Sequence, residues 1–450
     1  MIENIRKMWK IGEIRRKLIY TFLMLVLYRL VGVIPAPGVD AARVMASNGT
    51  SNLPLLELVN MMTGNNFSQM TVMAMGITPY INASIIMQLL TIAIPALERL
   101  SKEEDGRQKI NRITRYVTVG LAALQAIGLV RGLGYIKSGW INYVLVGVTM
   151  AGGTALAMWI GERITEKGIG NGISLLIFVG IISNLFNGII SGFNTAATTG
   201  TTSGWINLAV IIVTTIVMTV VVTFVELGER RINLQIAKQV KGRRVYGGQN
   251  THMSLKVVSV GVLPLIFAYS FLAFPGTIAQ LINPNAQPGS FAYWWATTMY
   301  TGSVWYMIIS ALLIIAFTFF YSSISFDPKQ QAEQLQQQGA VIPGQRGKNV
   351  RQYLQNTMNR LNLFAALFLA VLSAVPTLLL RLAGVSVPFA ASSILIAVSV
   401  SLETIRTLQG EMSIRGIDMD MDNVGFMYLK AIRGRGQASP PHFMERSATE

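Results

Sequence analysis

The sequence of 450 residues contains no cysteine and only two histidines, His252 and His442. Without cysteine, neither disulfide bonds nor thiolate metal sites can hold the fold, and two histidines provide few ligands for a metal cluster. We therefore expect no cofactor and no metal. Two isolated histidines also cannot supply the nucleophile, base and orienting group of a hydrolase, so the sequence predicts no enzymatic activity.

Charged residues are also scarce, at 13% of the chain, whereas hydrophobic residues make up 52% and the mean hydropathy is +0.47. This balance is far from that of a soluble protein and indicates a lipid bilayer as the solvent. A membrane-spanning helix needs about 20 apolar residues, because it must pair its own backbone amides in hydrocarbon. Ten segments meet this requirement, namely residues 18–34, 70–94, 113–130, 141–160, 172–190, 206–225, 257–282, 304–323, 361–380 and 388–405.

The formal net charge of +16 is distributed unevenly over the loops between these segments. An even number of spans places both termini on one side of the membrane, and the loops of that side carry 32 of the 37 lysines and arginines. The opposite loops carry four, and Arg29 lies within the first span. By the positive-inside rule, both termini are predicted to be cytoplasmic. This asymmetry explains the net charge without nucleic-acid binding.

Three loops are unusual. The cytoplasmic loops 226–256 and 324–360 are long, polar and basic, and alternating apolar residues in the first suit a hairpin as well as a helix. Loops of this length carry a partner surface or serve as tethers. The outer loop 37–70 contains LPLLELVNMMTG, which is too short to cross a bilayer and either lies in the interface or folds back into the protein.

Six stretches resemble signatures of the SecY family and occur in the order found in that family. They are GITPYINASIIMQLL (76–90), RQKINRITRY (107–116), GERITEKGIGNGIS (161–174), GRRVYGGQNTHMSLKV (242–257), GVLPLIFA (261–268) and SFDPKQQAEQLQQQGAVIPGQRG (325–347). On these motifs the chain is identified as a member of the family. The resemblance implies an all-α polytopic membrane protein, with ten transmembrane helices in two inverted, pseudo-symmetric halves around a central pore and a lateral gate.

The resemblance also implies the domain organisation. The N-terminal half comprises residues 18–190 and includes a plug at about 53–65, and the C-terminal half comprises residues 206–405. Residues 191–205 are expected to form an external hinge region. Residues 1–17 are expected to be a cytoplasmic amphipathic segment, and residues 406–450 a cytoplasmic tail. A lateral gate is expected between the second and third spans on one side and the seventh and eighth on the other.

The function implied by the resemblance is that of the channel-forming subunit of the Sec translocon in the bacterial inner membrane. Such a channel conducts unfolded secretory polypeptides across the membrane and releases transmembrane segments laterally into the lipid. The expected partners are the SecE and SecG subunits, the SecA motor, the ribosome, signal peptides and nascent membrane proteins. The channel itself is passive and has no small-molecule substrate, and ATP hydrolysis is expected in SecA.

A polypeptide channel needs a constriction that is apolar and offers no ligand to an ion, and isoleucine meets both needs. The resemblance implies a pore ring made of Ile77, Ile81, Ile177, Ile266 and Ile396. Ile77 and Ile81 are four residues apart and therefore share one face of a helix. Isoleucine is common in every span, so each of the five could instead face lipid or a neighbouring helix.

The resemblance implies three further groups of residues. The plug comprises Leu55, Leu56, Leu58, Val59, Met61 and Met62, and its flexible methionines would allow loose packing, the alternative being an interfacial helix. The lateral gate includes Asn82, Gln125 and Phe274. Hydrogen bonds between helices in membranes contribute about 0.6–2 kcal/mol each, which would bias such a gate toward closure, or would serve only to join helices.

Docking of SecA and the ribosome is assigned by the resemblance to Lys238, Arg243, Arg244 and Arg346. Arginine suits this role because its planar guanidinium pairs bidentately with carboxylate or phosphate. The alternative is that these charges only orient the chain in the membrane. The glutamine-rich run 330–338 and the long tail depart from the family pattern.

Two competing functions use the same architecture. An ion-coupled secondary transporter normally needs ionisable groups near the middle of the membrane. Here Arg29 lies within the first predicted span and Glu403 lies at the inner end of the tenth, which argues against ion coupling. The other competing function is a scaffold or insertase that never opens a full pore.

Overall fold

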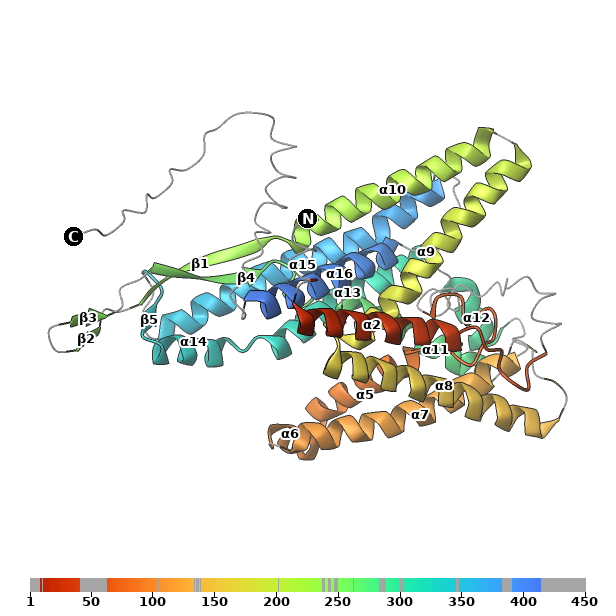
Figure 1. The fold of residues 1–450 in the computed structure, drawn as a ribbon, viewed down its shortest axis with the longest axis horizontal. Helices are drawn as coiled ribbons and strands as arrows, with labels where there is room; N and C mark the ends of the chain where they lie inside the picture. The colour runs from red at the N-terminus through yellow and green to blue at the C-terminus, as the bar shows by residue number, and fades with distance from the viewer. Residues whose placement is uncertain are drawn as a thin grey trace. The chain divides into compact units, whose positions relative to one another are not determined.

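The computed structural model describes residues 9, 11–40, 63–103, 105–132, 134, 137, 139–200, 202–236, 239–241, 244–246, 250–261, 263–282, 289–299, 303–344, 348–382 and 391–413. Every predicted span overlaps one described helix (Figure 1). In chain order these are α2 (Gly12–Val31), α5 (Thr78–Ala93), α7 (Gly106–Gly132), α8 (Trp140–Lys167), α9 (Gly172–Thr199), α10 (Thr202–Glu226), α11 (Leu263–Ile282), α13 (Val304–Ser325), α15 (Lys348–Leu382) and α16 (Ala391–Ser413). Three short helices join them, α6 (Pro95–Lys102), α12 (Phe291–Thr298) and α14 (Pro328–Gln337).

The chain divides into two compact units, Met1–Leu408 and Gln409–Glu450, and the packing below is that of the first. Among the described helices, five are long and apolar enough to cross a membrane by themselves, namely α8, α9, α10, α13 and α15. The pair α5 and α6, which bends by 106° before Pro95, makes a sixth if it is one broken span. The count of ten spans therefore remains a prediction.

The second predicted span differs from the structure at its beginning. We predicted a helix from residue 70, but α5 begins at Thr78, because Gly76 adopts a left-handed conformation with φ of +52°. Residues 70–77 instead form turns, and the backbone of 70–72 pairs with that of 34–36 through hydrogen bonds of 2.9 and 3.0 Å. Irregular backbone at membrane depth is tolerated where it is buried within protein, as it is here.

The helices share one main core of buried hydrophobic residues. It draws side chains from α5, α8 and α9 of the predicted N-terminal half and from α10, α11, α13, α15 and α16 of the predicted C-terminal half. A second cluster lies between α7, α8 and residues 67–75. The main core therefore joins the two predicted halves.

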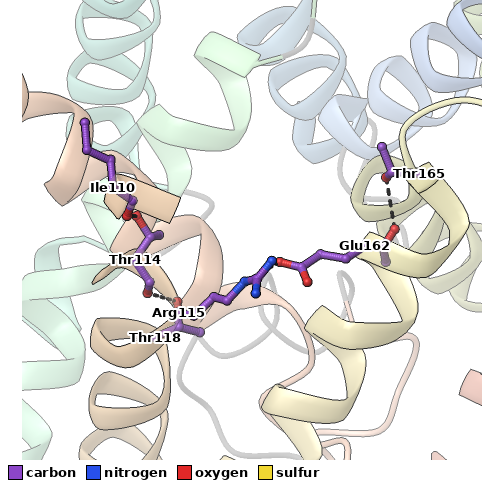
Figure 2. Close-up of polar contacts among 7 residues, drawn as sticks. Ile110, Thr114, Arg115, Thr118, Glu162 and Thr165 are labelled. Atoms are coloured by element: carbon purple, nitrogen blue, oxygen red, sulfur yellow. Dashed lines mark hydrogen bonds and ion pairs between the residues drawn. The ribbon is translucent and has the colours of Figure 1, made fainter. Parts of the chain in front are cut away.

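An ion pair links α7 to α8 (Figure 2). The Nε of Arg115 lies 2.8 Å from Oε1 of Glu162, and the two side chains are 51% and 33% exposed. Such exposed pairs stabilise a fold by at most about 1 kcal/mol. The neighbouring threonines Thr114 and Thr118 donate to carbonyl oxygens of their own helix, which pairs their hydroxyls within α7 (Figure 2).

The two long loops that are predicted to be cytoplasmic fold together into one small sheet. Strand β1 (Glu229–Ile236) pairs antiparallel with β4 (Asn250–Lys256), with Glu229 opposite Lys256. On its other edge β1 pairs with β5 (Ala340–Val341), so that the strand order is β4-β1-β5. Strands β2 (Gln239–Lys241) and β3 (Arg244–Tyr246) form a separate hairpin between β1 and β4. The sequence allowed a hairpin or a helix here, and the structure has the hairpin.

A hydrophobic cluster holds this sheet against α14 and the start of α15. It comprises Ile232, Leu234, Leu255, Leu335, Ile342, Leu354 and Met358. Leu354 and Met358 are one helical turn apart, and their burial explains why the 35-residue helix α15 begins well before the predicted span 361–380. Residues 330–337 of the glutamine-rich run lie in α14, whose first turn is capped by Asp327.

We predict that Leu354→Ala loosens the sheet. Leu354 is 0% exposed, and truncating a buried leucine costs about 2–5 kcal/mol. Amides of β1 and β4 are expected to exchange hydrogen faster, as measured by mass spectrometry of the detergent-solubilised protein. The matched control is Leu363→Ala, an exposed leucine on the same helix, which is expected to leave β1 unchanged. Equal exchange rates in both variants would contradict the prediction.

Candidate functional site

Five isoleucines that were predicted to line a pore are buried in one cluster. Each side chain is 2–5% exposed, and all five belong to the main core. Ile77 is the N-cap residue of α5 and accepts a hydrogen bond of 3.2 Å from the backbone N–H of Ile81, which places both in the first turn. The other three lie on α9, α11 and α16.

The five isoleucines add an apolar part to the core that joins the two predicted halves. They come from both predicted halves, and none carries a polar group that could coordinate an ion. Ile181, one turn beyond Ile177 on α9, is also buried in the core, and Ile173 packs against it.

The predicted gate residues lie on helices that pack together. Asn82 on α5 and Gln125 on α7 are both buried, and α11 packs against both of these helices. Phe274 lies in α11 beside Pro275, and its side chain is outside the described part of the structure. Asn82 and Gln125 are therefore buried on two helices that α11 contacts, and their role in a lateral gate remains a prediction.

A polar contact between α5 and α13 was missed in the sequence. The hydroxyl of Tyr321 on α13 donates to Oε1 of Gln88 on α5 at 2.5 Å, although the two residues are 233 apart in the chain. The ring of Phe267 on α11 packs against Tyr321, with 4.9 Å between ring centroids. Both polar residues lie inside apolar helices, which is the same signal that singled out Asn82 and Gln125.

Several predicted residues fall outside the described part of the structure. These are all six plug residues (Leu55, Leu56, Leu58, Val59, Met61 and Met62) and the docking residues Lys238, Arg243 and Arg346. Arg244 begins β3, but its side chain is also outside the described part. Their assignments therefore remain predictions. Among the residues that are described, no group of three or more acidic or histidine side chains is arranged to hold a metal ion.

Comparison with known sequences identifies relatives over nearly the whole chain. The family described as SecY matches residues 71–405. A protein translocase subunit SecY from Corynebacterium glutamicum is 38% identical, covering 90% of this chain and 96% of the relative. The same subunit from Thermus thermophilus is 36% identical, covering 95% of this chain and 98% of the relative.

Comparison with solved structures finds the same fold. A protein-conducting channel superposes with a TM-score of 0.67 at 20% identity, covering 90% of this chain and 94% of the other. A second structure, described in terms of a SecY plug domain that stabilises the closed channel and maintains a membrane seal, gives 0.66 at 20% identity, covering 90% and 93%. Sec61 in a canine ribosome-channel complex gives 0.64 at 19% identity, covering 90% and 94%.

We predict that Tyr321 and Gln88 are energetically coupled. In a double-mutant cycle with Tyr321→Phe and Gln88→Leu, the coupling in the free energy of unfolding in detergent is expected to be about 0.5–2 kcal/mol, because the two side chains share one hydrogen bond. A control cycle pairs Tyr321→Phe with Thr91→Val in place of Gln88→Leu. Thr91 lies on the same helix as Gln88, and its hydroxyl donates to a backbone carbonyl oxygen of that helix. Zero coupling between Tyr321 and Gln88 would show that the contact contributes nothing.

Proposed function

Because the chain belongs to the SecY family and is a channel-forming subunit of a protein translocase, we propose that its five buried isoleucines form the pore ring. The ring consists of Ile77, Ile81, Ile177, Ile266 and Ile396. It closes on itself when no polypeptide is present and excludes ions because an apolar constriction holds no stable water column. The observation that carries this proposal is the burial of all five side chains in one cluster shared by both halves.

The lateral gate lies along the seam between α5 and α7 on one side and α11 and α13 on the other. Asn82 and Gln125 contribute polar groups to it, and the hydrogen bond between Gln88 and Tyr321 closes it at a further point. Each such bond is weak enough for a signal peptide or a transmembrane segment to replace with its own contacts. Phe274 of α11 is assigned to the gate by the resemblance, and transmembrane segments leave the channel here for the lipid.

The plug, at about residues 53–65, seals the outer side of the ring in the resting channel. Its leucines and methionines pack loosely enough to leave when a polypeptide enters. This assignment draws support from the resemblance of the sequence and from the structural neighbour whose plug domain is described as maintaining a membrane seal.

The location and the partners follow from the distribution of charge. The protein lies in the bacterial inner membrane with both termini in the cytoplasm, since most of the basic residues lie in the loops of that side. It assembles with SecE and SecG and serves both the SecA motor, which hydrolyses the ATP, and the ribosome. A structural neighbour is itself part of a ribosome-channel complex, which supports the last of these partners.

The cytoplasmic sheet is the docking surface for these partners. Figure 1 shows the hairpin β2–β3 beyond the ends of β1 and β4, and Lys238, Arg243 and Arg244 lie in or beside this hairpin. Arg346 follows β5, which pairs with the same strand β1. The pairing of β5 with β1 therefore brings the two basic loops into one unit.

We predict that Ile81→Asn, like Ile77→Asn, loosens the closed channel. An amide in the ring offers ligands to water and ions, so ion conductance of the resting channel in planar bilayers is expected to rise, and precursors with defective signals are expected to be exported. The matched control is Ile92→Asn on the same helix, where the isoleucine is 54% exposed. If Ile81→Asn conducts no more than Ile92→Asn, the ring assignment is wrong.

We also predict that Arg346→Glu weakens export driven by SecA. Reversal of one charge at a bidentate contact is expected to lower the affinity for SecA roughly tenfold or more and to leave the fold intact. The control is Arg351→Glu, an exposed arginine on α15 in the same loop. The measurement is SecA binding to the reconstituted channel together with the rate of precursor export. Normal affinity and a normal rate would refute the docking role.

A further inference from the structure

Arg29 joins three parts of the chain that are far apart in sequence. It lies near the end of α2, within the first predicted span. Its Nη2 donates to the carbonyl oxygen of Val179 on α9 at 2.6 Å, and its Nη1 donates to the carbonyl oxygen of Gly64 at 3.2 Å. A charged residue inside a membrane protein is costly, so one that faces the interior and pairs with carbonyl groups points to a function.

Gly64 is shaped to receive this guanidinium. Its φ of +70° is in the left-handed region, which other residues adopt only with strain. A Cβ atom at this position would lie 2.4 Å from Nη1 of Arg29, so any side chain would displace the arginine. Both the conformation and the space at this position therefore favour glycine.

The segment around Gly64 is held on two further sides. Thr63 is 1% exposed, and a Cβ atom on Gly76 would lie 2.8 Å from its methyl group. The buried amide of Asn66 lies against Gly32, where a Cβ atom would lie 2.8 Å from Nδ2. Residues 63–66 are thus wedged between α2 and the turn that precedes α5.

Both ends of this arrangement reach the proposed pore ring. Val179 is two residues after Ile177 on α9, and Gly76, against which Thr63 packs, directly precedes Ile77. Arg29 therefore connects, through Val179 and through residues 63–66, to one ring residue of α9 and one of α5.

We propose that Arg29 is a positioning residue of the closed channel. Its guanidinium holds α2, α9 and residues 63–66 together and so keeps Ile77 and Ile177 in the closed ring. Arginine is suited to this because its charge-assisted hydrogen bonds are strong and its planar group reaches two carbonyl oxygens at once, whereas lysine is a single point of charge. The inference rests on the proposed ring, and residues 63–65 overlap the end of the proposed plug.

The first test measures how firmly residues 63–66 are held. The chain has no cysteine, so Thr63→Cys introduces a single thiol at a buried position. In liposomes, alkylation of this thiol by a membrane-impermeant maleimide is expected to be slow in the parent. Adding Arg29→Lys or Gly64→Ala is expected to accelerate it roughly tenfold, which corresponds to the loss of about one hydrogen bond to a charged group.

The second test measures the seal. Arg29→Lys and Gly64→Ala, each without the introduced cysteine, are expected to raise the resting ion conductance in planar bilayers. The controls are Arg163→Lys, which alters a surface ion pair with Glu166, and Gly120→Ala, where a Cβ atom meets nothing within 4 Å. Both controls are expected to match the parent in conductance.

The outcomes separate this inference from the proposed function. If Ile81→Asn conducts ions but Arg29→Lys and Gly64→Ala do not, the inference about Arg29 is refuted and the channel assignment stands. Unchanged alkylation of the Thr63→Cys thiol in both variants refutes it as well. If neither Ile81→Asn nor the Arg29 variant conducts, both the ring and the inference that rests on it are wrong.

Discussion

An unpaired backbone amide or carbonyl group in hydrocarbon costs several kcal/mol, and this constraint governs the whole structure. It explains why the apolar segments are helices, and why two irregular stretches among the described residues are covered by protein. Residues 70–77 are such a stretch, paired with residues 34–36 and packed in a core with α7 and α8. Residues 63–66 are another, supported by the Arg29 guanidinium.

The arrangement of helices along the chain could be predicted from hydropathy, because length and apolarity suffice to locate a helix that must pair its own backbone. The beginning of α5 could not. Residues 70–77 are as apolar as a helix, and buried turns and a helix leave the same hydropathy; only Gly76 and the nearby Pro79 mark the difference. For the loop 226–256 the local pattern fitted two structures, and the partner strand β5 lies about a hundred residues further along the chain.

For a similar reason, some parts of the candidate site could be predicted from the sequence and others could not. Apolar residues in the right spans could be identified as ring candidates, but only through the resemblance, because isoleucine has no property that distinguishes a pore from a packed core. The hydrogen-bond partners of the polar residues could not be predicted from the sequence. Arg29 and Val179 are 150 residues apart, and a carbonyl oxygen as acceptor leaves no trace in a sequence. Gln88 and Tyr321 could be recognised as polar residues in apolar helices, but the sequence gives no sign that they contact each other.

The length of α15 has a mechanical consequence. At 1.5 Å per residue, its 35 residues extend about 52 Å, whereas the hydrocarbon core of a membrane is about 30 Å thick. Its first turns are clamped beneath the sheet through Leu354 and Met358, and its later turns carry Ala365, Leu369 and Leu372 into the core that contains the isoleucines. Because one continuous helix joins the sheet cluster to the core of isoleucines, a force on the sheet is transmitted to that core along the helix axis and not through a loop.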